Sequence, residues 1–524
     1  MKNLFSIFLL LVSINTYSQG SIFDRQISAD QKVITNHSTT ILGEKVNYSA
    51  QIGTQPIWDV KGEVIATLHY TYYKRTDIED DSNRPLAFSF NGGPGSASIW
   101  MHMGYTGPYN LIIDDEGYPI QPYGYKSNPY SILDVADIVF VNPINIGYSR
   151  ILKEMTKQEA TDKFFGVNQD AKYLAEWMST FVSRSNRWKS PKYIIGESYG
   201  GVRVMGLAHE LQQNQWLYLN GVVLVSPADY ELRYESGGII LPTVDFPYFS
   251  ATAWYHNKLN KNLQEKSLEE IIETSEDFAY NELLPALAKG GYISEGKKDE
   301  IAKKIEILTG IEYDEIIKNN LNISTSFFWK ELLRDEGFTI GRLDSRYKGI
   351  DSKDSGNYFE YAPEMSAWDH AFTPAINSYI KEVLKFETDI KYNTWARNEL
   401  SVRPWDSDNI NIRRNFREAI AENPFLNVLM ENIRKKYICK NQIKKGFAGS
   451  RQLLSFFKNS YSIALMIDQR VSQGIKSKFF NNEAYTTTIP AQLVKKFNCK
   501  IVPIYIERIG DVNFTLTINN SIEY

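Results

Sequence analysis

The pentapeptide Gly196-Glu197-Ser198-Tyr199-Gly200 restricts the fold of this chain more than any other feature. It follows the apolar run Lys192-Tyr193-Ile194-Ile195, which predicts a strand, and it precedes Val202 to Leu211, which predicts a helix. A G-x-S-x-G sequence between a strand and a helix is the sharp turn that exposes a nucleophilic serine at the end of a sheet. Such a serine needs a general base, which in folds of this kind comes late in the chain. No histidine follows His370.

Strand-like and helix-like segments alternate around this turn. Period-two and fully apolar runs predict strands at Val64–Tyr73, Leu86–Phe90, Ile138–Val141 and Gly221–Ser226, and an amphipathic pattern predicts a helix over Lys163–Ser183. This order favours an α/β sheet with parallel strands. From Asp229 to Asp369 the pattern changes to charged helices, which we interpret as a helical cap insertion over the carboxyl edge of the sheet. The core resumes at Phe372–Leu384 and again at Phe425–Met430.

The first 19 residues have the layout of a secretory signal peptide. Lys2 precedes an apolar run from Leu4 to Ile14, which is too short to span a bilayer comfortably, and small residues follow before Gln19. The alternative interpretation is a buried amino-terminal helix. We expect an exported protein, periplasmic or secreted, with no membrane contact for the body.

Charge divides the chain near residue 432. Residues 433–524 contain 15 Lys and Arg against 5 Asp and Glu, a net of +10, and the whole chain is −4, so residues 1–432 carry −14. Both cysteines, Cys439 and Cys499, lie in the basic part, either as a disulfide or as two unrelated residues. The asymmetry indicates two parts of different character. Basic charge suits weak contact with an anionic membrane surface, although a solvated basic face explains it equally well.

A glycine-rich loop follows the predicted strand that ends at Phe90. The sequence Asn91-Gly92-Gly93-Pro94-Gly95-Ser96-Ala97-Ser98 exposes backbone N–H groups at the end of a strand, as an oxyanion or carboxylate site requires, although most glycine-rich turns are only turns.

Three spaced motifs together resemble the serine carboxypeptidase family. They are FNGGPGSASIWMHMGYTGPY from Phe90, SNPYSILDVADIVFVNPINIGYSR from Ser127 and YIIGESYGGVR from Tyr193, and KELLRDEGFTIGRLDSRYKGID from Lys330 resembles the cap of bacterial members. The resemblance covers roughly residues 45–432. It implies an α/β-hydrolase fold, a mostly parallel sheet flanked by helices with a helical cap.

The resemblance also implies roles for individual residues. Ser198 would be the catalytic nucleophile, and the N–H groups of Gly93 and Tyr199 would form the oxyanion hole. Asn91, Gly92 and Glu197 would bind the terminal carboxylate of a peptide substrate. Two carboxyl groups in contact require that one is protonated, so peptide cleavage would favour acidic pH.

The chain departs from the family pattern in two places. Asn142 to Ser149 reads NPINIGYS where many members have Asp-Pro-x-Gly-x-Gly-Tyr-Ser. The triad aspartate and histidine that should follow Phe425–Met430 are missing, because the chain instead continues Ile433-Arg434-Lys435-Lys436-Tyr437-Ile438. We interpret the six histidines as ordinary packed or surface residues. They are His37, His69, His102, His209, His256 and His370.

The tail resembles a different family. Ser462 to Ile509, with Asp468-Gln469-Arg470 and Val502-Pro503-Ile504, is similar to the carboxyl half of a bacterial lipid A lauroyl acyltransferase, and Arg434 to Lys458 fits the stretch before it. That family's catalytic His-x4-acid pair lies upstream of this half. Residues 433–524 contain no histidine, so this part lacks catalytic residues of its own.

These observations predict five segments: a signal peptide (1–19), a first core part (20–228), a helical cap (229–369), a second core part (370–432) truncated before its last strands, and an α/β acyltransferase-like fragment (433–524). Three hypotheses follow: a serine carboxypeptidase with an unconventional base, an impaired member that binds peptide carboxyl termini, or a chimera with an inactive acyltransferase fragment. We expect peptide or protein carboxyl termini as partners, no nucleic acid, no cofactor and no metal.

Overall fold

The structure is a computed structural model that describes residues 26–228, 238–396 and 412–522, apart from positions 424, 429–431, 433–434, 437–438, 444–446, 466–473, 480–481 and 511–512. The chain divides into two compact units, Met1–Ala228 with Asp369–Asn427 and Asp229–Trp368 with Val428–Tyr524. The predicted signal peptide lies outside the described residues.

The first unit, which we call the body, is built on one mixed sheet. Its strand order is β1 (Gln31–Ile41), β2 (Glu44–Trp58), β3 (Val64–Arg75), β7 (Asp137–Val141), β4 (Leu86–Phe90), β9 (Lys192–Glu197) and β10 (Gly221–Val225), with β8 (Arg150–Ile151) beside β3. The strands from β1 to β7 pair antiparallel, whereas β7, β4, β9 and β10 are parallel. The parallel half carries the glycine loop and the Ser198 turn.

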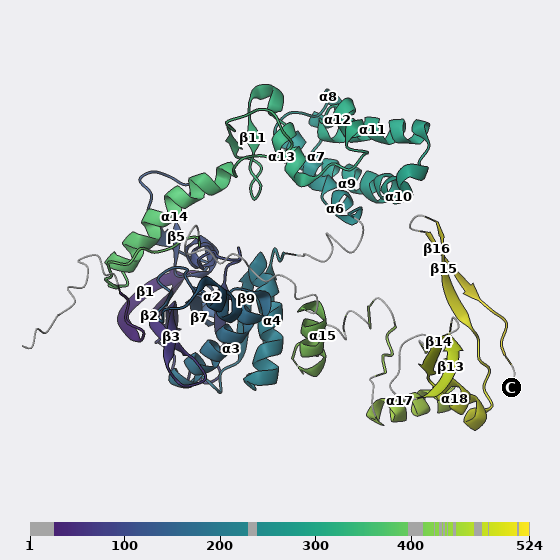
Figure 1. The fold of residues 1–524 in the computed structure, drawn as a ribbon, viewed down its shortest axis with the longest axis horizontal. Coiled ribbons are helices and arrows are strands. Elements are labelled where there is room, and N and C mark those ends of the chain that lie inside the picture. Colours follow the sequence, from purple (N-terminus) through teal and green to yellow (C-terminus); the bar gives the residue numbers. More distant parts are fainter. Residues whose placement is uncertain are drawn as a thin grey trace, which may run out of the picture. The chain divides into compact units, whose positions relative to one another are not determined.

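Helices pack on this sheet and enclose the core. Helix α3 (Val167–Arg184) lies beside α4 (Tyr199–Asn214), and α15 (Ile412–Glu422) lies beside α4 (Figure 1). The core contains Phe88, Trp177 and Leu207, and Ala419 of α15 belongs to it. Side chains fix α15 to the end of α4, because Gln212 Nε2 donates to Ala419 O (3.1 Å) and Asn423 Nδ2 donates to Gln212 Oε1 (2.6 Å). Residues distant in sequence thus complete one hydrophobic core.

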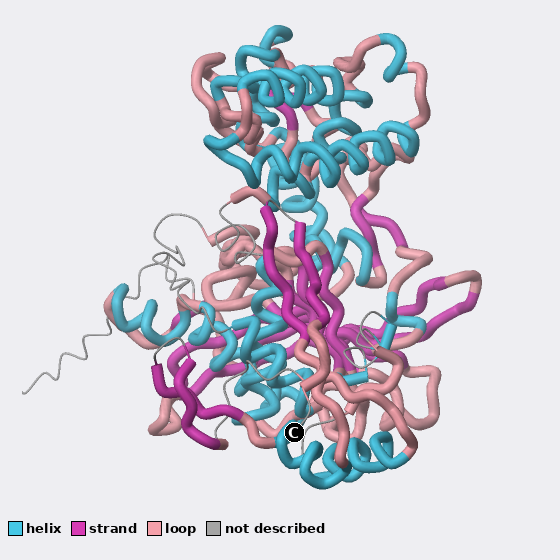
Figure 2. The backbone as a smooth tube through the Cα atoms, turned by 90° about the vertical axis from the view of Figure 1, so that its right-hand side faces the viewer, coloured by secondary structure: helices cyan, strands magenta, loops and turns pink. Residues whose placement is uncertain are grey.

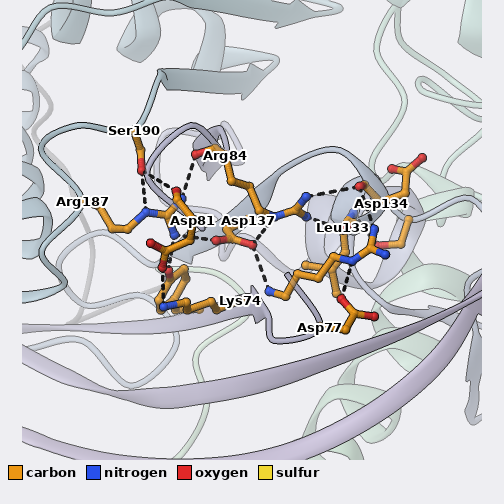
Figure 3. Close-up of polar contacts among 12 residues, drawn as sticks. Lys74, Asp77, Asp81, Arg84, Leu133, Asp134, Asp137, Arg187 and Ser190 are labelled. Atoms are coloured by element: carbon orange, nitrogen blue, oxygen red, sulfur yellow. Dashed lines mark hydrogen bonds and ion pairs between the residues drawn. The ribbon is translucent and has the colours of Figure 1, made fainter. Parts of the chain in front are cut away.

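A buried charge cluster closes the amino-terminal ends of β4 and β7 (Figure 3). Asp137, fully buried at the start of β7, accepts from Arg84 Nε (2.7 Å) and Arg187 Nη1 (2.5 Å). Burial alone would lower the pKa of Arg187, but Tyr72 and Asp137 outweigh it and raise that pKa above its usual value. The Arg187 guanidinium therefore remains charged inside the protein, where it shares the Asp137 carboxylate with Arg84.

The sheet ends at β10, whose residues are only partly covered. Among the described residues β10 pairs with β9 alone, and the Val223 side chain is 45% exposed. The sequence predicted that the core resumes at Phe425–Met430 with a strand-like apolar run. This prediction is wrong for the described positions 425–428, which form a turn and the start of a helix. A six-residue segment with five apolar residues fits a strand and a helix equally well.

The body has further described elements, most of them short, and it includes the larger part of α14. They are α1 (Ile99–Met101), η1 (His102–Thr106), β5 (Tyr109–Leu111), β6 (Tyr125–Ser127), η2 (Ile132–Asp134), α2 (Lys157–Phe164) and the body part of α14 (Pro363–Glu382).

The inserted segment of the second unit is mainly helical, as the cyan elements in Figure 2 show. Its core packs Phe249, Ile305 and Phe328 together. Its elements are α6 (Ile240–Val244), α7 (Phe246–Tyr255), α8 (Lys261–Gln264), α9 (Leu268–Phe278), η3 (Ala279–Leu283), α10 (Leu284–Lys289), η4 (Gly290–Tyr292), α11 (Glu295–Thr309), α12 (Tyr313–Lys318), α13 (Thr325–Glu331), η5 (Arg334–Glu336), β11 (Thr339–Ile340) and β12 (Lys348–Gly349).

The elements given for the described residues of the tail are two separate hairpins and two helices. The hairpins are β13 (Ile475–Phe479) with β14 (Asn482–Thr486) and β15 (Ile504–Gly510) with β16 (Asn513–Ile518), and the helices are α17 (Phe447–Lys458) and α18 (Ile489–Phe497). In the second hairpin Ile504 pairs with Ile518 and Ile506 with Leu516, and all four side chains are exposed. Cys439 and Cys499 are free thiols, so the disulfide interpretation is wrong for this structure.

Candidate active site

Ser198 occupies a tight turn between the parallel strand β9 and helix α4. Its backbone has φ 57° and ψ −123°, a strained conformation for a residue with a side chain. The turn is held by Ser198 N donating to Val225 O (3.0 Å) and by Ser198 O accepting from Gly201 N and Ala228 N (2.9 Å each). The half-buried Ser198 is thus fixed at the carboxyl end of a parallel strand.

The glycines of the pentapeptide are required by space. A Cβ on Gly196 would lie 2.0 Å from Gly200 O, and a Cβ on Gly200 would lie 2.9 Å from Phe90 O. Since strand, turn and helix approach one another this closely, larger residues would open the turn. The G-x-S-x-G spacing therefore has a packing cause that is independent of any chemistry.

The register of the sheet brings the glycine loop to Ser198. Phe90 at the end of β4 is the parallel partner of Gly196, so the residues after each strand lie side by side. A Cβ on Gly92 would lie 2.5 Å from Tyr199 N and 2.9 Å from Ser198 Cβ. Gly93 follows with φ 114°, which favours glycine. The structure thus brings Gly92 against Ser198 and Tyr199, with Gly93 next in the same loop.

Asn91 and Glu197 form a direct hydrogen bond beside this turn. Asn91 Nδ2 donates to Glu197 Oε2 (3.0 Å), and Asn91 Oδ1 accepts from Met101 N (2.9 Å). The buried amide is therefore fixed in one orientation, with its donor toward the half-buried carboxylate. Burial and, after it, the charge of Glu197 raise the pKa of nearby Tyr105 to about 12. A polar pair thus lies next to the serine.

A buried ion pair between Arg203 and Asp170 supports the site through Asn91, and the sequence analysis did not predict it. Arg203 on α4 donates to Asp170 Oδ2 (2.5 Å) on α3 and to the Asn91 carbonyl (2.6 Å). Burial raises the pKa of Asp170, and Arg203 offsets part of this effect. Arg203 is the last residue of the motif YIIGESYGGVR, so the sequence could have indicated it as a residue of the site. No motif indicated Asp170 as its partner.

Asn142, at the point of departure from the family motif, anchors the glycine loop. Its Oδ1 accepts from Ser98 N (2.9 Å), while its Nδ2 lies 2.8 Å from Nδ1 of buried His69. The segment after α14 holds the same loop, because Ala97 N donates to Thr394 O (2.9 Å) and Ala396 N to Gly95 O (2.8 Å). The NPINIGYS variant therefore positions the loop through a neutral amide.

None of the six histidines, all of which the structure describes, is hydrogen-bonded to Ser198. Among the described residues the Ser198 hydroxyl has no hydrogen-bond partner. His69 is next to Asn142, and Nε2 of His102 lies 2.6 Å from the Tyr73 hydroxyl. Burial lowers the pKa of each of these two imidazoles to about 3, so both are neutral.

The contacts of the other four histidines are with groups other than Ser198. His37 contacts Thr35 Oγ1, His209 lies 3.9 Å from Glu418, His256 lies 2.7 Å from Ser345 O in the second unit, and His370 is exposed on α14.

No group of His, Cys, Asp or Glu suited to a metal ion occurs in the part of the chain that the structure describes. No described helix is both long and apolar enough to cross a membrane.

A serine in a strained turn between a parallel strand and a helix, with a glycine loop beside it, is typical of the α/β hydrolases. Within this class the chain belongs to the serine carboxypeptidase family, whose model matches residues 58–325, just over half of the chain. A second model, for bacterial lipid A biosynthesis acyltransferases, matches residues 416–524. That match begins inside the segment predicted as hydrolase core and includes most of α15.

Curated relatives include proteins that carry the same family name. Serine carboxypeptidase-like 31 of Arabidopsis thaliana is 25% identical over 298 residues, which cover 50% of this chain and 55% of the relative. The mouse lysosomal protective protein is 26% identical over 200 residues, 37% of this chain and 36% of that protein. The chain thus spans about a third to a half of the relatives that it matches. A solved prohormone-processing carboxypeptidase from Saccharomyces cerevisiae shares 14% identity over 67% of each chain, with a TM-score of 0.35.

Proposed function

We propose that the body binds peptide carboxyl termini as a serine carboxypeptidase does, and that it transfers acyl groups to Ser198 only slowly. Ser198 is the nucleophile, the N–H groups of Gly93 and Tyr199 form the oxyanion hole, and Asn91, Gly92 and Glu197 bind the terminal carboxylate. The observation that carries the proposal is a correctly turned Ser198 whose hydroxyl contacts no imidazole among the described residues.

The chemistry explains why turnover would be slow. Attack on the scissile carbonyl requires that the serine proton leaves, and a histidine ordinarily accepts it and later gives it to the leaving amine. Without that base, the oxyanion hole and substrate binding retain a residual rate of about 10³–10⁴-fold over water. The body therefore keeps the electrostatic part of catalysis and loses proton transfer.

Covalent labelling tests this deficit. We expect a fluorophosphonate to modify Ser198 about 10⁴-fold more slowly than it modifies a family member with a complete triad. Intact-mass measurement over time gives the rate. Ser198→Ala should abolish the slow modification, whereas Ser82→Ala on an exposed loop should leave it unchanged. Rapid labelling that is lost in Ser198→Ala would show that an unconventional base completes the site.

Peptide binding tests the recognition site separately. Glu197 and a peptide carboxylate must share a proton, so affinity should rise by up to about tenfold per pH unit as the pH falls. Calorimetric titration from pH 7 to 5.5 with a free-acid peptide, and with its carboxyl-terminal amide as control, measures this dependence. Glu197→Gln should bind the free acid at pH 7 and lose the pH dependence. Equal affinity for acid and amide would contradict the proposed carboxylate site.

A second candidate is a chimera in which a peptide-binding body is joined to an inactive acyltransferase fragment. The change of charge, the match of residues 416–524 to another family and the exposed apolar hairpin β15–β16 support it. Long-read sequencing across the codons for Met430 to Lys436 is the direct test, because reads that depart from this junction would show that the join is an assembly fault. We also propose that residues 1–19 direct export of the chain. The basic tail would make weak contact with anionic membranes.

A further inference from the structure

A hollow of about 310 Å³ lies in the body at the edge of the sheet opposite to Ser198. It is formed by the loops that enter β9 and β10, so it opens at the amino-terminal ends of these parallel strands, whereas Ser198 follows the carboxyl end of β9. Its volume is at the lower end of the range for small-molecule sites. Its lining includes Trp188, Lys192, Trp216, Tyr218 and Asn220.

Three aromatic rings at this hollow remain in solvent. Trp188 is 45% exposed, Trp216 78% and Tyr218 51%. Large aromatic side chains gain most of their folding energy from burial, so rings that stay exposed around one hollow do little for the fold. Trp188 is held in place, because its Nε1 donates to Ser183 Oγ (3.0 Å). The hollow therefore has one fixed aromatic wall, Trp188, beside two further exposed rings.

The backbone of Trp216 gives a second, independent indication. Trp216 has φ 49° and follows the C-cap of α4. Glycine or asparagine is usual at this left-handed position, because a bulky side chain is strained there. Asparagine occupies this position after three other helices, α3, α7 and α12, as Asn186 (φ 56°), Asn257 (φ 58°) and Asn320 (φ 51°), whereas the small Ser460 (φ 62°) follows α17. A tryptophan is thus retained at an asparagine position although its ring is not buried.

Lys192 supplies a charge in the lining of the hollow. Its side chain is only 6% exposed, its Nζ donates to Trp188 O, and the Nζ lies 5.7 Å from the centre of the Trp188 ring. Burial and, after it, the charge of Arg187 lower the pKa of Lys192 to about 8, so the amine is mostly protonated at neutral pH. No described carboxylate pairs with it. A buried cation with a single carbonyl acceptor favours an anionic partner and disfavours a cationic ligand in this aromatic setting.

We propose that this hollow binds a small ring-bearing carboxylic acid, whose carboxylate pairs with Lys192 while its ring packs against Trp216 and Trp188. An aromatic acid and an acidic sugar share this chemistry, since both present a carboxylate next to a flat face with apolar C–H or π character. The inference concerns a site separate from Ser198 and does not depend on the peptide-binding proposal.

Binding is measured with the full chain by saturation-transfer NMR and calorimetry. Benzoate with benzamide as its neutral match probes the aromatic source, and glucuronate with glucose probes the sugar source. In at least one pair the acid should bind about tenfold more tightly than its neutral match, because only the acid compensates Lys192. Equal affinity within both pairs, or no binding of either acid at tens of millimolar, would overturn the proposal.

Trp216→Asn separates binding from folding. This variant places in α4 the residue that already closes α3, so its midpoint of urea unfolding should be unchanged or higher, while affinity for the acid falls about tenfold. Lys192→Met should lose the preference for the acid over its neutral match. Tyr130→Asn removes another exposed ring of the body and should bind normally. Full affinity in Trp216→Asn would refute the proposed site.

Discussion

Acidification is expected to destabilise the body by about 1.4 kcal/mol per pH unit for each of two buried histidines, His69 and His102. Their folded pKa values are about 3, whereas an unfolded histidine has a pKa near 6.5. Below pH 6.5 the unfolded chain therefore binds protons at these two histidines, whereas in the folded body both imidazoles stay neutral until the pH approaches 3. Stability is lost as the pH falls toward 3, and the combined loss is about 5 kcal/mol at pH 4.5.

Hydrogen exchange followed by mass spectrometry localises this effect. Peptides from β3 and β7 report the opening of the body, and their protection is compared at pH 6.5, 5.5 and 4.5 after correction for intrinsic exchange. His102→Phe should lower the pH dependence of the opening free energy by the share of one histidine, about 1.4 kcal/mol per pH unit. His370→Gln at the surface is the control and should leave this dependence unchanged. An unchanged dependence in His102→Phe would contradict the assignment. The acidity that we expect to favour binding of a peptide carboxylate should therefore also destabilise the body.

Replacement of Asp137 by asparagine is expected to lower the free energy of unfolding by about 3–5 kcal/mol. The substitution leaves Arg84 and Arg187 charged and buried without their shared carboxylate, while the shape of the side chain hardly changes. Urea unfolding at pH 7, monitored by tryptophan fluorescence, measures the difference. The exposed pair of Glu63 with Lys153 is the matched control, and Glu63→Gln should change stability far less than Asp137→Asn does, because solvent screens this pair. A comparable loss in both variants would show that burial does not decide the effect.

The parts of the site that depend on local sequence were predictable. The turn at Ser198 and the glycine loop at Asn91 to Gly93 each follow an apolar strand, and parallel pairing of those strands brings them together. The family resemblance supplied the roles, whereas spacing alone supplied only the positions. The fold class and the family are confirmed.

Other parts depend on contacts that a sequence does not encode locally. Strands β1 and β2 were not predicted, since their polar alternation is weak evidence for a strand and their stability comes from pairing with β3. The partnership of Arg203 with Asp170 joins two helices and emerges only in three dimensions. Phe425–Met430 was interpreted as part of a strand because a short apolar run carries no reliable period.

The discontinuity of the body affects how it forms during synthesis. Helix α15 packs against α4, where Gln212 of α4 is hydrogen-bonded to Ala419 of α15. This helix is translated after the whole inserted segment Asp229–Trp368. At about 5–20 residues per second, a ribosome needs roughly 7–28 s to translate that insertion. During this interval the nascent chain exposes an apolar surface on α4, which makes the growing polypeptide a client for chaperones before its core is complete.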